Sequence, residues 1–252
     1  MLVLKDRDGH PIRDGRDWTR PKKASQWKPG RSAMALAQAW FPGPGPVCPR
    51  EVRELLASRP ETAGVALTEG WPEYVTPLPE RGEGRNHDLL LVGENAGRAV
   101  VVSVEAKVDE PFGDRIGDYW RSARQSRTPT RAPERIQALL RLVFGPDARP
   151  DAEPWAPLRY QLLTMIAGTA IEAKRREAPE AIALIHEFRT TSASPEKLET
   201  NSRDFDAFMS VLLAPGNVRV TPGQLHGPVV LKGEPHLPHP ITLYVGKAIS
   251  QG

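Results

Sequence analysis

The stretch from His87 to Lys107, "HDLLLVGENAGRAVVVSVEAK", decides the fold and raises a question about function. It contains two apolar runs separated by a short polar turn, which is the pattern of an antiparallel β-hairpin. Asp88 opens the first run, and Glu105 and Lys107 close the second. Three charged side chains therefore stand at one end of two strands whose other residues suit a buried sheet.

The position of the turn determines whether these charges meet. In an antiparallel pair, facing residues have numbers with a constant sum and point to the same face. A two-residue turn at Asn95–Ala96 gives a sum of 191, and a turn at Ala96–Gly97 gives 193, with Asp88 directly opposite Glu105. Both registers put Asp88 on the face of Glu105, because side chains alternate along a strand. A three-residue turn would put it on the other face.

Two carboxylates brought close together are unfavourable unless a cation compensates them, and the amine of Lys107 cannot neutralise both. Mg²⁺ is the natural partner of carboxylate and carbonyl oxygens. Such an ion polarises a phosphoryl oxygen and lowers the pKa of its bound water. Lys107 can orient or deprotonate the attacking water, or stabilise charge that develops on the phosphate. The charges of the hairpin therefore predict hydrolysis of phosphodiester bonds.

Asp88 followed 17 positions later by Glu105-Ala106-Lys107 resembles the PD-(D/E)XK nuclease superfamily, and bacterial members in particular. The resemblance implies a restriction-endonuclease-like αβββαβ core, with the aspartate on the second strand and the Glu-x-Lys motif on the third. It departs from the motif at His87, which stands where the motif has proline, a residue that is often absent in the superfamily. It implies cleavage of DNA, less often RNA, with Mg²⁺ or with Mn²⁺ in its place. The superfamily also includes inactive members that bind nucleic acid or a protein partner.

The resemblance also implies roles for individual residues. Asp88 and Glu105 would be metal ligands, together with the backbone carbonyl of Ala106, and Lys107 would be the catalytic lysine. An acidic residue on the first helix often contributes in this superfamily. The candidates for it here are Glu54, which is favoured, then Glu51, and Glu73 beside the neighbouring strand.

Some relatives add a glutamine or a basic residue from a helix packed beside the site. Gln161 is the first candidate for this auxiliary role, and Gln125 is the second. Asp109 and Glu110 follow Lys107 directly, and Glu110 can shape the site or hold a second ion. Ordinary loop polarity explains the two acids equally well.

Arginines are concentrated after the hairpin. The segment 115–141 carries seven arginines against two acidic residues, and clustered arginine attracts phosphates. Arg115, Arg121 and Arg124 are therefore candidates for nucleic-acid contacts. A solvated basic surface is the competing interpretation. Trp120 stands beside them and can stack on a base, although core packing is the more common role of tryptophan.

The remaining pattern predicts an α/β (α+β) fold with a mixed central sheet flanked by helices. Outside the hairpin, strands are expected at 2–4, 64–67, 73–78, 180–188 and 241–249. Helices are expected at 30–40, 50–58, 113–126, 133–145, 158–176 and 202–216. This order divides the chain into an N-terminal arm and helix (1–46), a nuclease-like core (47–190) and a C-terminal helix and strand extension (191–252) packed on the same domain.

Several classes of function are disfavoured. A single cysteine, Cys48, excludes an internal disulfide or a thiolate metal cluster. No apolar run approaches the roughly 20 residues of a membrane span, and the first apolar run is too short for a secretory signal, so a cytoplasmic location is expected. No phosphate-binding GxxxxGK[ST] motif is present, which disfavours a nucleotide cofactor. The expected partner is nucleic acid, first of all DNA, and cutting both strands would suit a homodimer by analogy. An interaction protein with surface charges on its hairpin is the alternative from another class.

Overall fold

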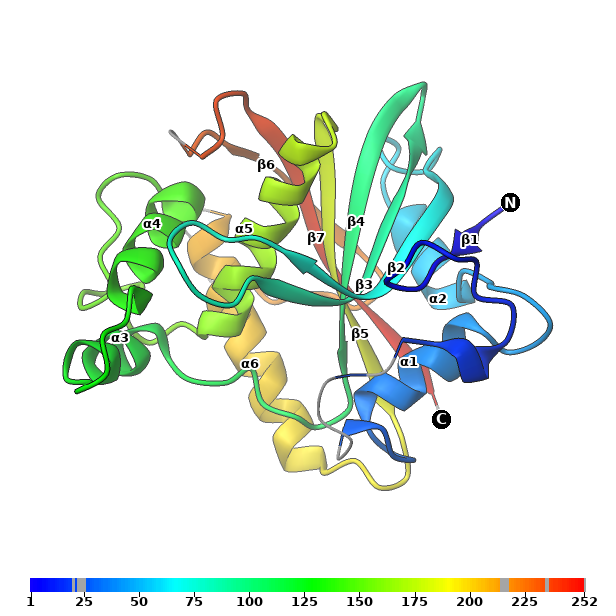
Figure 1. Cartoon of the computed structure of the whole chain (residues 1–252), viewed down its shortest axis with the longest axis horizontal. Coiled ribbons are helices and arrows are strands. Elements are labelled where there is room, and N and C mark those ends of the chain that lie inside the picture. The colour runs from blue at the N-terminus through cyan, green and yellow to red at the C-terminus, as the bar shows by residue number, and fades with distance from the viewer. Residues whose placement is uncertain (20, 22–25, 214–217, 234–235, 252) are drawn as a thin grey trace.

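A computed structural model describes residues 1–19, 21, 26–213, 218–233 and 236–251. These residues form a seven-stranded mixed sheet with helices on both faces (Figure 1). The strands are β1 (Val3–Leu4), β2 (Ala66–Thr76), β3 (Arg85–Asn95), β4 (Arg98–Lys107), β5 (Glu180–Arg189), β6 (Leu225–Leu231) and β7 (Ile241–Gln251). The helices are η1 (Gly15–Asp17), α1 (Ser32–Trp40), α2 (Arg50–Leu56), α3 (Ile116–Arg124), α4 (Ala132–Phe144), α5 (Tyr160–Arg175) and α6 (Pro195–Leu212).

The strand order in the sheet is β1-β2-β3-β4-β5-β7-β6. β2, β3 and β4 form an antiparallel meander, and β4, β5 and β7 run parallel to one another. α5 makes the crossover from β4 to β5, as a parallel connection requires. The predicted α/β class with a mixed central sheet is therefore confirmed.

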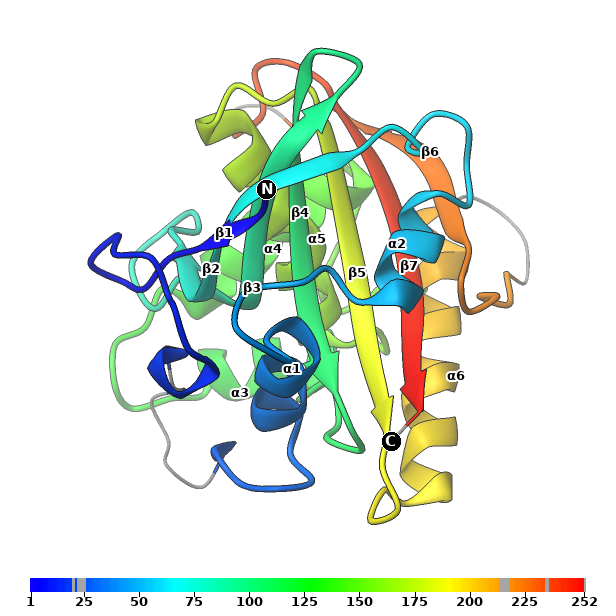
Figure 2. The same ribbon diagram turned by 90° about the vertical axis from the view of Figure 1, so that its right-hand side faces the viewer.

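The sheet separates two hydrophobic cores, and each core is covered by its own helices (Figures 1 and 2). α3, α4, α5 and α6 lie on one side, and α1 and α2 lie on the other. β4 has apolar residues on both faces, with Val101 in the first core and Val102 in the second. That burial on both sides explains the run of valines in its sequence. α5 is apolar nearly all round because it lies between the sheet and α4.

The β3–β4 hairpin has the second of the two predicted turns. Asn95 pairs with Arg98, and Ala96 and Gly97 have φ values of 50° and 77°. Positive φ at both central residues is the type I′ geometry that fits the twist of the two strands. The predicted odd register is therefore confirmed from the turn as far as the pair Leu89 and Val104.

Two of the strand predictions need correction. The segments 64–67 and 73–78 are not separate strands, because β2 runs through both. A bulge between Leu67 and Glu69 and a positive φ of 52° at Glu73 disturb the alternation that normally reveals a strand. β6 was not predicted, since Gly227 and Pro228 in its centre look like a strand breaker.

The last predicted helix begins earlier than expected. α6 starts at Pro195, where the Ser194 side chain caps it by accepting from the backbone N–H of Lys197. Its first two turns are mostly exposed and polar, so they lack the apolar period that marks the rest. The predicted end of this helix, 214–216, lies outside the described residues.

The terminal segments contribute strands to the same sheet as the central segment. β1 pairs with β2, and β7 pairs with β5 along its whole length. Leu243 and Val245 of β7 are fully buried in the core beside α5. The segments 1–46, 47–190 and 191–252 thus share one continuous sheet.

Candidate active site

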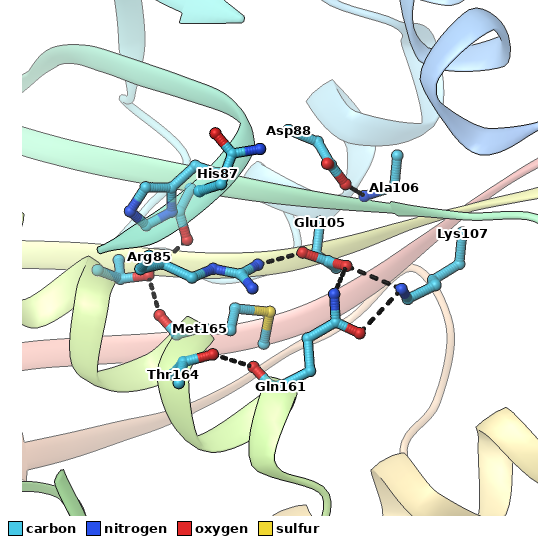
Figure 3. Close-up of polar contacts among 12 residues, drawn as sticks. Arg85, His87, Asp88, Glu105, Ala106, Lys107, Gln161, Thr164 and Met165 are labelled. Atoms are coloured by element: carbon cyan, nitrogen blue, oxygen red, sulfur yellow. Dashed lines mark hydrogen bonds and ion pairs between the residues drawn. The ribbon is translucent and has the colours of Figure 1, made fainter. Parts of the chain in front are cut away.

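Asp88 lies at the point where β3 separates from β4. The ladder between the strands ends with Leu89 opposite Val104, so the facing pair of Asp88 and Glu105 that the register predicts does not form. Instead, Asp88 Oδ2 accepts a 2.7 Å hydrogen bond from the backbone N–H of Ala106 (Figure 3). The N–H groups of a strand point toward the neighbouring strand. The carboxylate therefore lies in the gap that β3 leaves beside β4.

The side-chain alternation of β3 breaks at the same place. Leu90 belongs to the core on the α5 side. His87 faces α5 as well, since its Nε2 lies 3.0 Å from the Thr76 hydroxyl, which itself donates to Glu172 of α5. Regular alternation would put residues three apart on opposite faces. This irregularity turns Asp88 toward the edge of β4.

Glu105 is the centre of a buried polar cluster on the α5 side of β4 (Figure 3). Arg85 donates from Nη2 to its Oε2. Its Oε1 lies 2.9 Å from Lys107 Nζ and accepts a 2.6 Å hydrogen bond from Gln161 Nε2. The side chains of Arg85, Glu105 and Lys107 are only 6%, 3% and 8% exposed. Charges this deep in a protein need partners, and here each of them has one.

Gln161 connects Lys107 to Glu105 from the first turn of α5. Its Oε1 accepts from Lys107 Nζ at 3.0 Å, while its Nε2 donates to Glu105. A side-chain amide can do both at once, because it has an acceptor and a donor end. Lys107 Nζ also lies 5.1 Å from the centre of the Phe112 ring, within the range of a cation–π contact. The lysine is thus held in one orientation beside the glutamate.

A third carboxylate, Glu73, belongs to the same region. It is 5% exposed, and its Oε2 accepts a 2.7 Å hydrogen bond from Asn86 Nδ2. Glu73 is on β2, which makes it the neighbouring-strand alternative of the sequence prediction. Sequence reasoning missed Asn86 and Arg85, because it interpreted both as part of a loop. The charge of Arg85 at the start of an apolar strand was the signal that could have drawn attention to it.

The environment shifts the pKa values of these three acids in different directions. Burial, followed by the charge of Glu105, raises the pKa of Asp88 well above its usual value. Burial also raises the pKa of Glu73. Burial acts on Glu105 in the same direction, but the charges and hydrogen bonds of Lys107 and Arg85 outweigh it and lower the pKa of Glu105 to about 2. The cluster therefore holds one firmly ionised carboxylate and two that resist ionisation.

Two cavities meet at Asp88 and Glu105. The cavity that we call the lysine cavity has a volume of about 310 Å³ and is bordered by Glu73, Ala106 and Lys107 as well. The second, which we call the tyrosine cavity, has a volume of about 480 Å³ and reaches Tyr119 and Tyr160. Asp88 and Glu105 thus border the same space, as the prediction required, although they do not face each other across the hairpin.

The carbonyl of Ala106 was the third predicted ligand. The N–H and C=O groups of one strand residue point to the same side of the strand. Since the Ala106 N–H points to Asp88, its carbonyl faces the same gap between β3 and β4. Ala106 also borders the lysine cavity. The structure therefore brings together Asp88, Glu105, Lys107, Gln161 and this carbonyl.

The acids predicted on the first helix lie elsewhere. Glu54 is on the exposed side of α2 and forms an ion pair with Arg50. Glu51 accepts hydrogen bonds from His186 and Ser250 on the opposite face of the sheet from Lys107. α2 packs on β7, so neither acid borders the lysine or tyrosine cavity.

Glu110 borders the lysine cavity, but its carboxylate already accepts hydrogen bonds from other parts of the chain. It accepts from the N–H and hydroxyl of Ser32 at 3.2 Å and from the N–H of Val108 at 2.8 Å. Glu110 thus binds the first N–H group of α1 from a distant part of the chain.

The three predicted phosphate-binding arginines are on or beside α3. Arg115 is the exposed N-cap residue, Arg121 pairs with Asp118, and the guanidinium of Arg124 lies 4.6 Å from the ring centre of Trp120. None of them borders the two cavities. Gln125, the second auxiliary candidate, is exposed at the end of α3 and does not border them either.

The donor set at the end of the sheet fits a hard divalent cation. Three carboxylates, Glu73, Asp88 and Glu105, lie in the same region as two cations, Arg85 and Lys107, and burial raises the pKa values of Glu73 and Asp88. Oxygen ligands of this kind suit Mg²⁺ or Mn²⁺. The most direct holders would be Asp88, Glu105 and the Ala106 carbonyl, with Glu73 close by.

The spacing of these acids differs from that of a closed metal cluster. Within the described residues, the only group of three possible ligand side chains with all ligand atoms within 4.8 Å is Asp6, Asp8 and His10. That group is a turn in the N-terminal arm, where Asp6 accepts from two backbone N–H groups. An ion at the sheet end would have to draw its carboxylates together or bind some of them through water.

The fold and the site define an α/β protein with a carboxylate and lysine cluster at one end of a mixed sheet. A family model described as "Domain of unknown function (DUF6946)" matches residues 11–251, so the chain belongs to the DUF6946 family. Neither the curated proteins nor the solved structures contain a match to the chain. In the described part of the chain, no helix has both the length and the apolar character to cross a membrane.

Proposed function

We propose that this protein is a metal-dependent nuclease that hydrolyses phosphodiester bonds of nucleic acid, with DNA as the first candidate substrate. The observation that carries the proposal is the convergence of Asp88, Glu105 and Lys107 on one cavity at the end of the β3–β4 hairpin. Asp88 and the Glu-Ala-Lys motif come from neighbouring strands and meet where the strands separate. That position leaves room for a phosphate beside both acids.

The topology supports the same proposal. The order α2, β2, β3, β4, α5, β5 corresponds to the αβββαβ core that the PD-(D/E)XK resemblance implies. The aspartate is on the second strand of the meander, and the Glu-x-Lys motif is on the third. β4 pairs in parallel with β5 after the α5 crossover. α3 and α4 are additions between the third strand and the second core helix.

Each residue of the site has a task in such a reaction. Asp88, Glu105 and the Ala106 carbonyl would hold Mg²⁺ or Mn²⁺, which when bound supplies Lewis-acid activation of the phosphate and of water. The ammonium of Lys107 would stabilise the negative charge that develops on the phosphate or orient the attacking water. Gln161 fixes Lys107 and Glu105 relative to each other. Arg115, Arg121 and Arg124 would contact phosphates farther along the strand.

One observation favours an alternative. Glu105 has Arg85 on one oxygen and both Lys107 and Gln161 on the other. A carboxylate that is satisfied in this way can be a structural centre without a metal. The alternative is therefore a catalytically inactive protein of the same fold, which binds nucleic acid or a protein partner in the cytoplasm, alone or as a homodimer.

A digestion panel tests the proposal. Plasmid DNA, single-stranded DNA and RNA are incubated with the protein in Mg²⁺, in Mn²⁺ or in EDTA. Asp88→Asn and Lys107→Met are compared with two matched controls. Glu94→Gln changes an exposed acid on the same strand as Asp88, and Lys174→Met changes an exposed lysine on α5. We expect cleavage that requires the metal, falls at least a hundredfold in the two site variants and is unchanged in the controls.

The other outcomes point elsewhere. Cleavage that persists in Lys107→Met and Asp88→Asn comes from a contaminant or another site, and it overturns the assignment. Binding of nucleic acid without cleavage under any condition supports the inactive alternative. The absence of both would leave an interaction protein that does not recognise nucleic acid.

A further inference from the structure

The tyrosine cavity is an extension of the candidate active site that the proposed reaction does not use. Its volume of about 480 Å³ lies within the range of roughly 300–1,000 Å³ typical of small-ligand sites. Asp88, Glu105 and Gln161 border it on one side, so a group bound in it would lie directly beside the reacting centre. Its remaining wall comes from α3, α4, α5 and the β2–β3 loop.

One part of the cavity wall is aromatic. Tyr119 of α3 and Tyr160 of α5 lie with their ring centres 4.8 Å apart and their planes inclined by 54°. Both side chains are half-buried and both border the cavity. Aromatic rings at the edge of a polar cavity are suitable platforms for a nucleobase, because every base offers a face for stacking.

The adjoining wall is basic. The buried guanidinium of Arg135 donates to the backbone carbonyls of Pro79, Arg81 and Glu83. Among the described residues no carboxylate forms an ion pair with Arg135 or with Arg81, which also borders the cavity. Guanidinium groups without a carboxylate at ion-pair distance suit a phosphate of a bound strand.

The cavity is held in a fixed shape. The same hydrogen bonds of Arg135 fasten the β2–β3 loop to α4, and Arg131 at the start of α4 pairs with Glu80 of the loop at 2.9 Å. Gly82 has a φ of 133° and leaves no room for a Cβ beside the Arg135 guanidinium. A wall fastened in this way forms a recess that can be occupied without rearrangement.

From these features we infer that the tyrosine cavity binds one unpaired nucleotide next to the cleaved phosphate, with its base against Tyr119. The inference rests on the proposed function and names its substrate class. A nucleotide in a continuous duplex must leave its stack to enter such a recess, whereas a nucleotide in a single strand need not. The protein should therefore prefer single-stranded nucleic acid or unpaired strand ends over a blunt duplex.

Binding can be measured without cleavage. Fluorescence anisotropy with labelled 12-nucleotide probes in EDTA compares single-stranded DNA, single-stranded RNA, a blunt DNA duplex and a DNA strand that carries abasic spacers in place of bases. We expect Tyr119→Ala to weaken binding of the single strand about tenfold, since stacking contributes about that factor per base. Tyr119→Phe keeps the ring and should bind like the wild type. The abasic strand should not distinguish the variants.

Two further variants separate the cavity from its surroundings. Trp71→Leu removes an aromatic residue of β2 that borders neither the lysine nor the tyrosine cavity, and it should leave binding unchanged. Thr130→Trp fills the cavity from its exposed rim and should weaken binding of the single strand even if Tyr119→Ala does not fold. The DNA and RNA arms show which strand chemistry the cavity accepts.

The outcomes distinguish this inference from the nuclease proposal. Equal binding of duplex and single strand, or equal loss with the normal and the abasic strand in Tyr119→Ala, overturns the nucleotide pocket. Cleavage in the digestion panel would stand in either case. Conversely, the protein could bind a single strand in a way that depends on the Tyr119 ring and yet never cleave it. That result would support the nucleotide pocket and contradict the nuclease proposal.

Discussion

Asp88 and Glu105 border the same cavities, yet their surroundings shift their pKa values in opposite directions. The pKa of Glu105 is lowered to about 2, so its ionised form stabilises the folded state above a pH of about 4.5, and this contribution disappears as the pH falls toward 2. The pKa of Asp88 is raised, mainly by burial and then by Glu105. In the metal-free protein at neutral pH, an ionised Asp88 therefore opposes folding.

Replacement of Asp88 by asparagine should consequently stabilise the metal-free protein. Because the folded-state pKa lies above the unfolded value of 3.8, stability is lost as the pH rises from there through the folded-state pKa. The new amide oxygen would still accept from the Ala106 N–H. The free energy of unfolding in urea at pH 7 with EDTA should rise by about 1 kcal/mol, a common size for the effect of one substitution. A lower value in Asp88→Asn would show that the carboxylate is not under electrostatic strain.

Arg85 is expected to compete with a metal ion for Glu105. It donates to Glu105 Oε2 and adds a buried positive charge beside the other acids. Arg85→Met removes this hydrogen bond and this positive charge. It should raise the affinity for Mn²⁺ about tenfold, since two charges at close range interact by more than about 1 kcal/mol even near a protein surface. Free Mn²⁺ can be followed by electron paramagnetic resonance without any substrate. Arg81→Met, at the rim of the tyrosine cavity, is the matched control, and equal affinities in both variants would contradict the competition.

At the scale of elements, the site depends on how closely α5 approaches β3. Gly168 of α5 lies directly against Arg85, and a Cβ at this glycine would come within 2.7 Å of Arg85 Cγ and 2.9 Å of its Cβ. Glycine is unfavourable in a helix interior, so its presence here has a packing reason. The close contact places Arg85 beside Glu105. It also places the N-terminal turn of α5, which carries Gln161, beside Lys107.

Gly168→Ala should therefore destabilise the protein by roughly 1–3 kcal/mol, as overpacking does in other cores. The sign of this change in the free energy of unfolding is diagnostic, because glycine to alanine in an uncrowded helix stabilises a protein by about 1 kcal/mol. Chemical denaturation measures the difference. In the Arg85→Ala background, Gly168→Ala should cost less stability than in the wild type, because the contact with Cγ is gone, but some cost should remain, because the Cβ of residue 85 still lies 2.9 Å from the new methyl group. A stabilised single variant would mean that α5 is free to shift away from β3.

The sequence could predict what depends on local pattern, and not what depends on packing. An odd hairpin register followed from the turn and two apolar runs, although two turns remained open, and Gln161 was proposed because the resemblance implies a glutamine on a helix beside the site. The separation of β3 from β4 at Asp88 could not be predicted, because it depends on an irregularity in β2 and β3 that leaves no period in the sequence. Arg85 was interpreted as part of a loop, and its contact with Glu105 could not be predicted, since it requires the closeness to α5 that Gly168 permits.

At the scale of the whole molecule, the sheet joins residues that are far apart in the chain. β7 lies beside β5 and pairs with it over ten residues, and its buried Leu243 and Val245 complete the core under α5 and α6. The C-terminal segment is thus a part of the central sheet rather than an attachment to it. The arm contributes as well, since Gln26 borders both the lysine and the tyrosine cavities.

A fragment that consists of residues 47–190 should therefore fail to fold by itself. It would expose the apolar core face of α5 and the unpaired edge of β5 to water, which favours aggregation. Circular dichroism and size-exclusion chromatography of the fragment against the full chain measure this directly. A monomeric fragment with a cooperative unfolding transition would show that the terminal strands are dispensable for the core.

The Asp88 side chain accepts the hydrogen bond of the Ala106 N–H, which in a regular ladder would go to a backbone carbonyl of β3. The amide proton of this alanine is therefore a built-in spectroscopic probe of the carboxylate beside it. In a nitrogen-15 correlation spectrum, its resonance should move when Asp88 gains a proton and move again, differently, when a diamagnetic cation such as Mg²⁺ or Ca²⁺ arrives. The binding of a proton or a cation at Asp88 can then be followed without any substrate.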